Sequence, residues 1–232
     1  MRAAGISRRL LVPGIMTAVM LAVLIGLGTW QVYRLRWKEG VLDRIAKAEA
    51  SPPVPLMPVP SPYAKVEVTG RFMPDLTAQF GAEVRDTAAG TQLGTRLIEP
   101  LERAGESPVL VDRGWVPVNR RQPVDQPNGT VTVVGYVHPA DKASWFSAPD
   151  DPAARQFYTL DPAAIAAALG LPKVEPFILV ALGEPHAGQW PEPARHLPRP
   201  PNNHLSYVIT WYGLALALVA VFIVWARKGT NA

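Results

Sequence analysis

The sequence of 232 residues contains no cysteine. This absence excludes a disulfide framework, a thiol redox centre and the cysteine-based copper sites that copper chaperones usually need. Histidine is scarce as well, and three of the four histidines, His138, His186 and His196, are scattered without the spacing of a metal site. The sequence also lacks a glycine-rich phosphate loop and a nucleophile-elbow motif, and Asp150-Asp151 is typical of a turn. We therefore expect no enzyme active site.

Charged residues are missing from two long stretches. Leu10–Tyr33 and Leu205–Ala226 are each long enough to cross a bilayer as a helix, which takes about 20 apolar residues. The first stretch is longer than the core of a typical signal peptide and has no clear cleavage site, so we interpret it as an uncleaved anchor. Gly14, Gly26 and Gly28 leave room for the close approach of a second helix. We expect the two spans to pack on each other.

The net charge of +4 comes from the chain ends, which contain no acidic residue. Their basic residues are Arg2, Arg8, Arg9, Arg227 and Lys228. The rest of the chain is nearly neutral, which argues against a nucleic-acid-binding surface. Basic residues also follow the first span directly, so the positive-inside rule is nearly balanced there. The acid-free tails favour both termini inside and the large middle segment outside.

The expected organisation follows from these stretches. It consists of a cytoplasmic tail at 1–9, a transmembrane helix at 10–33, an amphipathic helical extension and proline-rich spacer at 34–62, an extracytoplasmic β-rich domain at 63–199, a transmembrane helix with a polar start at 200–226, and a cytoplasmic tail at 227–232. Trp30, Tyr33 and Trp37 are typical of an aromatic belt at the end of the first span.

The middle segment shows the period-two alternation of β-strands. The expected strands are 63–72, 76–83, 95–101, 108–118, 131–137, 156–160 and 177–182. One short helix interrupts them, with Asp161 as its cap, Pro162 at its first position and Gly170 after its end. Short strands with one small helix predict a compact β-barrel or sandwich between two membrane helices.

His204 lies where the second span begins. Asn202 or Asn203 is a natural N-cap for this helix. At helical spacing, His204 shares a stripe with Val208, Trp211, Ala215 and Phe222. An imidazole above a tryptophan and a small residue is suited to ligate a flat hydrophobic cofactor, and the alternative is a simple hydrogen bond or cap at the interface.

Two aromatic motifs of the middle domain each have two interpretations. Val109–Pro117, which reads VLVDRGWVP, is either a strand with Asp112 and Arg113 exposed or paired at a glycine bulge and Trp115 in the core, or a surface for a partner. Trp145-Phe146 and Trp190 either belong to the core or rest on the bilayer surface.

Several motifs occur in a specific order along nearly the whole chain. They are Gly28-Thr29-Trp30-Gln31 with Arg34-Leu35 and Trp37-Lys38, then Gly70-Arg71-Phe72, then Val111-Asp112-Arg113-Gly114-Trp115-Val116-Pro117, and finally Asn202-Asn203-His204-Leu205-Ser206-Tyr207 with Thr210-Trp211-Tyr212. In these motifs the chain resembles the surfeit-locus family of cytochrome c oxidase assembly factors, in its bacterial form. The resemblance implies a two-pass protein of the bacterial inner membrane, with both termini cytoplasmic and the middle domain periplasmic.

The resemblance also implies a function and its site. The family assists the maturation of subunit I of an aa3-type haem-copper oxidase, and its bacterial members are thought to bind and deliver haem a. The ligand to the haem iron would be His204, and Tyr207 and Trp211 would line the macrocycle. At the outer boundary of the membrane, Arg34, Arg36 or Lys38 is placed either to pair with the propionates or to reach lipid headgroups. Subunit I, membrane lipids and haem a synthase are the candidate partners.

Two competing functions stay open. The first is a membrane scaffold that stabilises nascent subunit I without carrying haem. The second is an enzyme of haem modification, which the presence of one histidine at membrane depth disfavours.

Overall fold

The structure is a computed structural model that describes residues 8–87, 90–186 and 188–230. Two units make up the chain: residues 1–44 with 199–232, and residues 45–198. Long helices near the two termini and a mainly β domain with one short helix confirm the expected fold class. The helices are α1 (Arg8–Ala50), α2 (Pro162–Ala168) and α3 (His204–Thr230). The strands are β1 (Val54–Pro55), β2 (Lys65–Phe72), β3 (Ala78–Thr87), β4 (Gly90–Arg103), β5 (Glu106–Pro117), β6 (Val131–Pro139), β7 (Gln156–Phe157) and β8 (Phe177–Ala181).

Helices α1 and α3 contain the two apolar stretches. Both are long and apolar enough to cross a membrane, judged by length and composition. Most of their apolar side chains are exposed, which a lipid environment would cover. These findings support a two-pass membrane protein.

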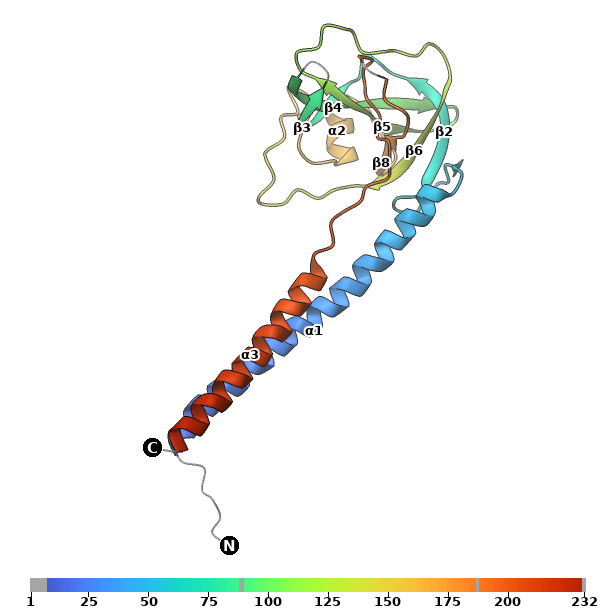
Figure 1. The fold of residues 1–232 in the computed structure, drawn as a ribbon. Helices are drawn as coiled ribbons and strands as arrows, with labels where there is room; N and C mark the ends of the chain where they lie inside the picture. Colours follow the sequence, from blue (N-terminus) through green and yellow to red (C-terminus); the bar gives the residue numbers. More distant parts are fainter. Residues whose placement is uncertain (1–7, 88–89, 187, 231–232) are drawn as a thin grey trace. The chain divides into compact units, whose positions relative to one another are not determined.

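The strands form one sheet in the order β1-β2-β6-β8-β5-β4-β3-β7 (Figure 1). An additional pairing of β2 with β4, at Arg71↔Glu102 and Phe72↔Leu101, joins the sheet back onto itself. The ring β2-β6-β8-β5-β4 is therefore a closed barrel, and β3 and β7 continue the sheet beyond β4. Closure removes the exposed strand edges that a sandwich would leave.

Apolar residues fill both sides of the central strands. Val109 and Val111 of β5 belong to a cluster with β2, β6 and β8, whereas Leu110, between them, belongs to a second cluster with α2. Helix α2 begins as expected, since the Asp161 carboxylate accepts hydrogen bonds from the amides of Ala163 and Ala164. Because both faces of β5 are covered there, its residues 109–111 are consecutive apolar residues rather than an alternation.

The Val109–Pro117 motif is buried, and its structural interpretation is confirmed. Gly114 has φ of +125° at an irregularity in the β4–β5 register, and Trp115 is fully buried. An added Cβ at Gly114 would lie 1.9 Å from the carbonyl oxygen of Glu192. Only glycine allows this segment to approach so closely.

Residues 188–198 form a strap along the barrel towards α3. The amide of Trp115 donates to the Glu192 carbonyl at 2.8 Å, and the amide of Glu192 donates back to the Trp115 carbonyl at 2.8 Å. Trp190 packs edge-on against Trp115, with 5.5 Å between ring centroids. Trp145 and Phe146, in contrast, are exposed, so the core interpretation of this pair is wrong.

Candidate functional site

Helices α1 and α3 face each other along a seam of small, apolar and polar residues. Their better-buried positions recur every three or four residues, the spacing of a coiled-coil interface. On α1 the series includes Thr17, Leu21, Leu24, Gly28, Gln31 and Leu35. On α3 it includes the expected stripe of His204, Val208, Trp211, Ala215 and Phe222.

Of the three glycines in the apolar stretch Leu10–Tyr33 of α1, two belong to this seam. A Cβ at Gly28 would lie 3.0 Å from the Tyr212 ring, and a Cβ at Gly14 would lie 3.8 Å from Phe222. A Cβ at Gly26 would meet nothing within 4 Å. The expectation of close helix approach is therefore confirmed at Gly14 and Gly28 and wrong at Gly26.

At the start of α3, His204 makes a hydrogen bond to the opposite helix. Its Nδ1 lies 2.7 Å from Oε1 of Gln31, a residue 173 positions earlier in the chain. Gln31 is only 8% exposed, and His204 is half-buried. Because a carbonyl oxygen can only accept, Nδ1 donates, and in the neutral imidazole this tautomer has its lone pair on Nε2. The geometry therefore presents Nε2 as the free ring nitrogen.

The backbone around His204 is held by its asparagine neighbour. The His204 amide donates to Oδ1 of Asn202 at 3.4 Å, as an N-cap side chain would accept it. The polar residues before the helix thus satisfy one of its free amides, as expected from the sequence.

Below His204, the seam contains a second polar contact and an unpaired donor. The hydroxyls of Thr29 and Tyr212 lie 3.1 Å apart. Among the described residues, the indole Nε1–H of Trp211 is buried and has no hydrogen-bond partner. A buried donor without an acceptor is unfavourable by about 1 to 3 kcal/mol, so this nitrogen is suited to a polar atom of a bound molecule.

The other residues expected at the site lie outside the seam. Tyr207 is 52% exposed, and Arg36 is exposed. The guanidinium of Arg34 lies 4.5 Å from the ring centroid of Trp37, as a cation–π contact. The structure therefore brings His204 and Trp211 to one helix face and leaves Tyr207 and the two arginines accessible from outside it.

Gln31 is the residue that sequence reasoning missed. Its signal was present, since it is an amide in an otherwise apolar span and lies seven residues after Leu24, on the same helix face. Its partner could not be read from the sequence, because the register of α3 against α1 is a tertiary property.

The barrel domain contains two buried ion pairs. Arg113 donates to the Glu99 carboxylate at 2.6 Å, and Arg96 pairs with Asp112. Burial raises the pKa of Glu99 above its usual range, against the opposing effect of Arg113. Burial likewise raises the pKa of Asp112. Both carboxylates are buried in the core and paired, which suits a structural role better than a catalytic one.

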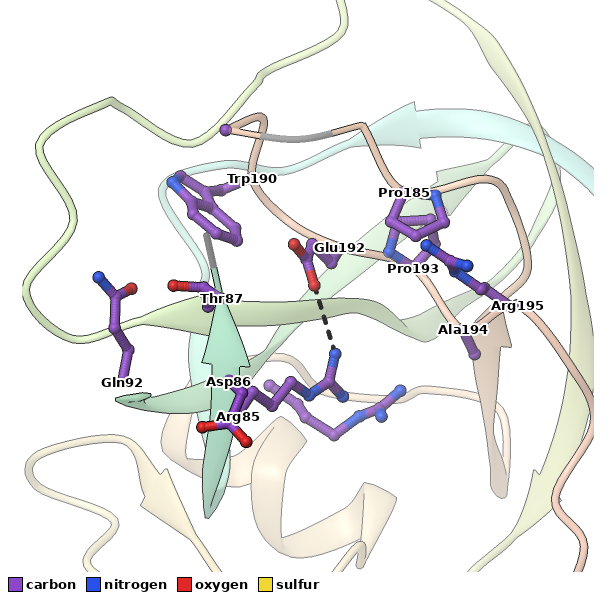
Figure 2. Close-up of a pocket in the computed structure, with 12 residues that line it drawn as sticks. Arg85, Asp86, Thr87, Gln92, Pro185, Trp190, Glu192, Pro193, Ala194 and Arg195 are labelled. Atoms are coloured by element: carbon purple, nitrogen blue, oxygen red, sulfur yellow. Dashed lines mark ion pairs between the residues drawn. The ribbon is translucent and has the colours of Figure 1, made fainter. Parts of the chain in front are cut away.

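A pocket of about 590 Å³ lies beside the strap (Figure 2). Arg85, Arg96 and Arg195 line it together with Trp190 and Glu192. Figure 2 shows Glu192 facing Arg85, and these side chains form an ion pair at 3.5 Å. Arg85 and Arg96 are already paired with carboxylates, which offset their charge in this pocket.

The remaining histidines do not form a site. His138 Nδ1 donates to the Pro139 carbonyl at 2.8 Å, and exposed His196 lies 3.0 Å from Glu49. Within the described ranges, no three His, Cys, Asp or Glu residues gather as metal ligands would. Of the histidines, His204 alone lies on a helix that could span a membrane.

The fold and the helix seam define a class of protein, with two apolar helices that flank a closed β-barrel domain. A family model described as the SURF1 family matches residues 18–216. A SURF1-like protein of Rickettsia conorii is 27% identical over 217 residues, which cover 90% of this chain and 89% of that protein. Surfeit locus protein 1 of Mus musculus is 29% identical over 219 residues, which cover 84% of this chain and 70% of that protein. The chain belongs to the SURF1 family.

Proposed function

We propose that this protein is an assembly factor for an aa3-type cytochrome c oxidase, and that it binds haem a and passes it to subunit I. Membership of the SURF1 family and the resemblance of its motifs support this function. The observation that carries the site is the bond of His204 Nδ1 to Gln31, which leaves Nε2 available at the start of a membrane helix.

Three residues of the seam, Gln31, His204 and Trp211, have a role in this proposal. The Gln31 carbonyl oxygen accepts a hydrogen bond from Nδ1–H, which holds the imidazole plane and favours the tautomer in which Nε2 can be a ligand. Neutral imidazole is a common ligand of haem iron, and His204 would hold the iron through the lone pair of Nε2. Trp211 supplies an aromatic face and an unpaired N–H donor beneath the imidazole.

The outer residues would hold the polar edge of the haem. Arg34 and Arg36 would pair with propionates, while the exposed Tyr207 ring would cover part of the macrocycle. Contact with lipid headgroups is the competing use of these arginines. Because His204 is a single protein ligand, haem could transfer to an acceptor with a higher affinity, and the protein needs no catalytic chemistry of its own.

The proposed location is the inner membrane of a bacterial cell, with both termini in the cytoplasm and the barrel domain in the periplasm. The acid-free basic tails and the resemblance support this orientation. Subunit I is the proposed acceptor, and haem a synthase is a candidate donor.

The alternative is a scaffold that stabilises nascent subunit I without haem. The wide apolar surfaces of α1 and α3 outside their seam favour it, since a membrane subunit could pack there as well as lipid.

An absorption spectrum tests the proposal. The full chain is purified in detergent after co-expression with a haem a biosynthetic pathway, as wild type, as His204→Ala and as His196→Ala. The last variant is the matched control, because His196 is exposed and lies outside the spans. We expect a haem a spectrum in the wild type and in His196→Ala and none in His204→Ala. Equal spectra in all three would place the ligand elsewhere. Folded wild type that contains no haem and still co-purifies with the oxidase would favour the scaffold.

A further inference from the structure

The loop between β6 and β7 presents two aromatic rings to solvent. Trp145 is 88% exposed and Phe146 is 80% exposed. The rings pack on each other, with 4.2 Å between their centroids. Such large exposed apolar side chains usually mark a contact surface.

The backbone holds these rings at the tip of a tight turn. The Ser144 amide donates to the Ser147 hydroxyl at 3.0 Å, and the Ser147 amide donates to the Ser144 carbonyl at 2.9 Å. Both ends of the loop are fastened to the chain after β7. The Asp141 amide donates to the Leu160 carbonyl at 2.9 Å, and Asp150 accepts from the Tyr158 amide at 2.6 Å. The tip is thus a compact projection with defined ends.

The loop leaves the barrel at the end where the chain enters it. Lys65, at the start of β2, pairs with Tyr136 near the end of β6. The Lys65 ammonium donates to the carbonyls of Glu49 and Ser51, where α1 ends. The last strand of this corner, β6, then continues into the aromatic loop.

The chain also leaves the barrel domain at this end. His196, two residues before the end of this unit, lies 3.0 Å from the same Glu49. The connections to both candidate spans therefore start from one end of the domain, the end at which β6 continues into the loop of Trp145 and Phe146. The spacer at this end exposes two more apolar side chains, Met57 and Val59.

We propose that the Trp145-Phe146 tip rests in the lipid headgroup region of the membrane that the two helices span, as a third contact of this protein with the bilayer. Aromatic rings with small polar neighbours favour this region. Residues 143–149 contain no charge, so the tip can enter the interface without desolvating an ion. The two rings together are too small a surface for a stable protein interface, which supports lipid as the occupant. This inference is independent of haem binding.

The absence of cysteine allows a clean test, because one introduced cysteine carries the only label. Ala148→Cys places a nitroxide beside the tip, and Thr130→Cys places it before β6 begins, at the opposite end of that strand. Both positions are exposed. The labelled full chain is reconstituted into vesicles of phosphatidylethanolamine and phosphatidylglycerol. Collisions of the nitroxide with oxygen, which concentrates in bilayers, are compared with collisions with a water-soluble nickel chelate.

We expect a severalfold higher ratio of oxygen to nickel accessibility at position 148 than at position 130. The added changes Trp145→Ser and Phe146→Ser should bring the ratio at 148 down to that at 130, because the tip then loses its apolar anchor. An equal, water-like ratio at both positions in the parent chain would overturn the proposal and assign the rings to a protein partner. A high ratio at 148 that the serine changes do not alter would also overturn it, because the rings would then not be the anchor.

Discussion

Replacement of Gln31 by leucine is the most direct test of how the helix seam prepares His204. Leucine has a similar size and removes the Oε1 atom, which lies 2.7 Å from Nδ1 of His204 and accepts its hydrogen bond. Because Gln31 is only 8% exposed, water has little access to replace it. The imidazole would then lose the contact that selects its tautomer and orientation.

The expected magnitude follows from this geometry. A buried donor left without its acceptor is destabilised by about 1 to 3 kcal/mol. Loss of a hydrogen-bond partner of a ligating histidine typically lowers metal affinity about 10- to 100-fold, equivalent to about 1.4 to 2.7 kcal/mol. The two ranges agree, so we expect Gln31→Leu to weaken haem binding about 10- to 100-fold.

Two measurements on the full chain check this expectation. Haem titration gives the affinity, and ¹⁵N NMR of histidine-labelled protein without haem shows which ring nitrogen carries the proton. Four histidines contribute signals, and His204→Ala identifies the one from His204. Thr29→Val is the matched control, because it removes the other polar contact between the two helices. Gln31→Glu keeps an acceptor oxygen and should retain the Nδ1-protonated form.

A Gln31→Leu protein with wild-type haem affinity and an unchanged Nδ1-protonated signal would refute this reasoning. Equal weakening by Thr29→Val and Gln31→Leu would show that the effect comes from helix packing rather than from the imidazole.

Three further changes test the packing and the electrostatics of the fold. Gly28→Ala should weaken the packing of α1 against α3, because its Cβ would lie 3.0 Å from an aromatic ring of α3. Gly26→Ala should leave this packing unchanged, because its Cβ would meet nothing within 4 Å. The yield of crosslinks between the two helices within the chain compares the two variants. Gly114→Ala should lower the free energy of unfolding of the barrel by about 3 kcal/mol or more in denaturant titrations, because the new Cβ clashes with a backbone carbonyl and the residue has a positive φ. Gly105→Ala has the positive φ without the clash and should lower the free energy of unfolding by about 1 to 2 kcal/mol. Burial raises the pKa of Tyr136 from 10.0 to about 12. The contribution of Tyr136 to the free energy of unfolding is therefore fully present below pH 10 and is lost as pH rises towards 12, a loss of about 2 to 3 kcal/mol. Tyr136→Phe should remove that part of the decline in stability at alkaline pH.

Each of these changes has an outcome that contradicts it. Equal crosslinking of the two helix variants would show that the seam is not close-packed at Gly28. Similar stabilities of the Gly114 and Gly105 variants would show that the strap can move away. An alkaline decline that persists unchanged in Tyr136→Phe would assign it to other groups.

Local chemistry explains why much of the fold could be predicted. The uncharged stretches have the length of a bilayer span, and the alternation in the middle segment has the period of a strand. Asp161 followed by Pro162 specifies a helix start through hydrogen bonds to adjacent amides. The position of His204 at the start of α3 was predictable in the same way, because it follows prolines and asparagines and precedes an apolar stretch.

The candidate site and the barrel closure required contacts between distant parts of the chain. Gln31 and His204 are separated by 173 positions, and only the packing of α1 against α3 makes them neighbours. The pairing of Arg71 with Glu102 closes the barrel, although neither residue signals it locally. The same holds for Arg113, which the sequence left either exposed or paired and which the structure pairs with Glu99 in the core. Periodicity and capping act over a few residues, so the sequence by itself determined the elements. Register and partner choice arise from the sum of many weak contacts, so the tertiary structure alone decided which side chains meet.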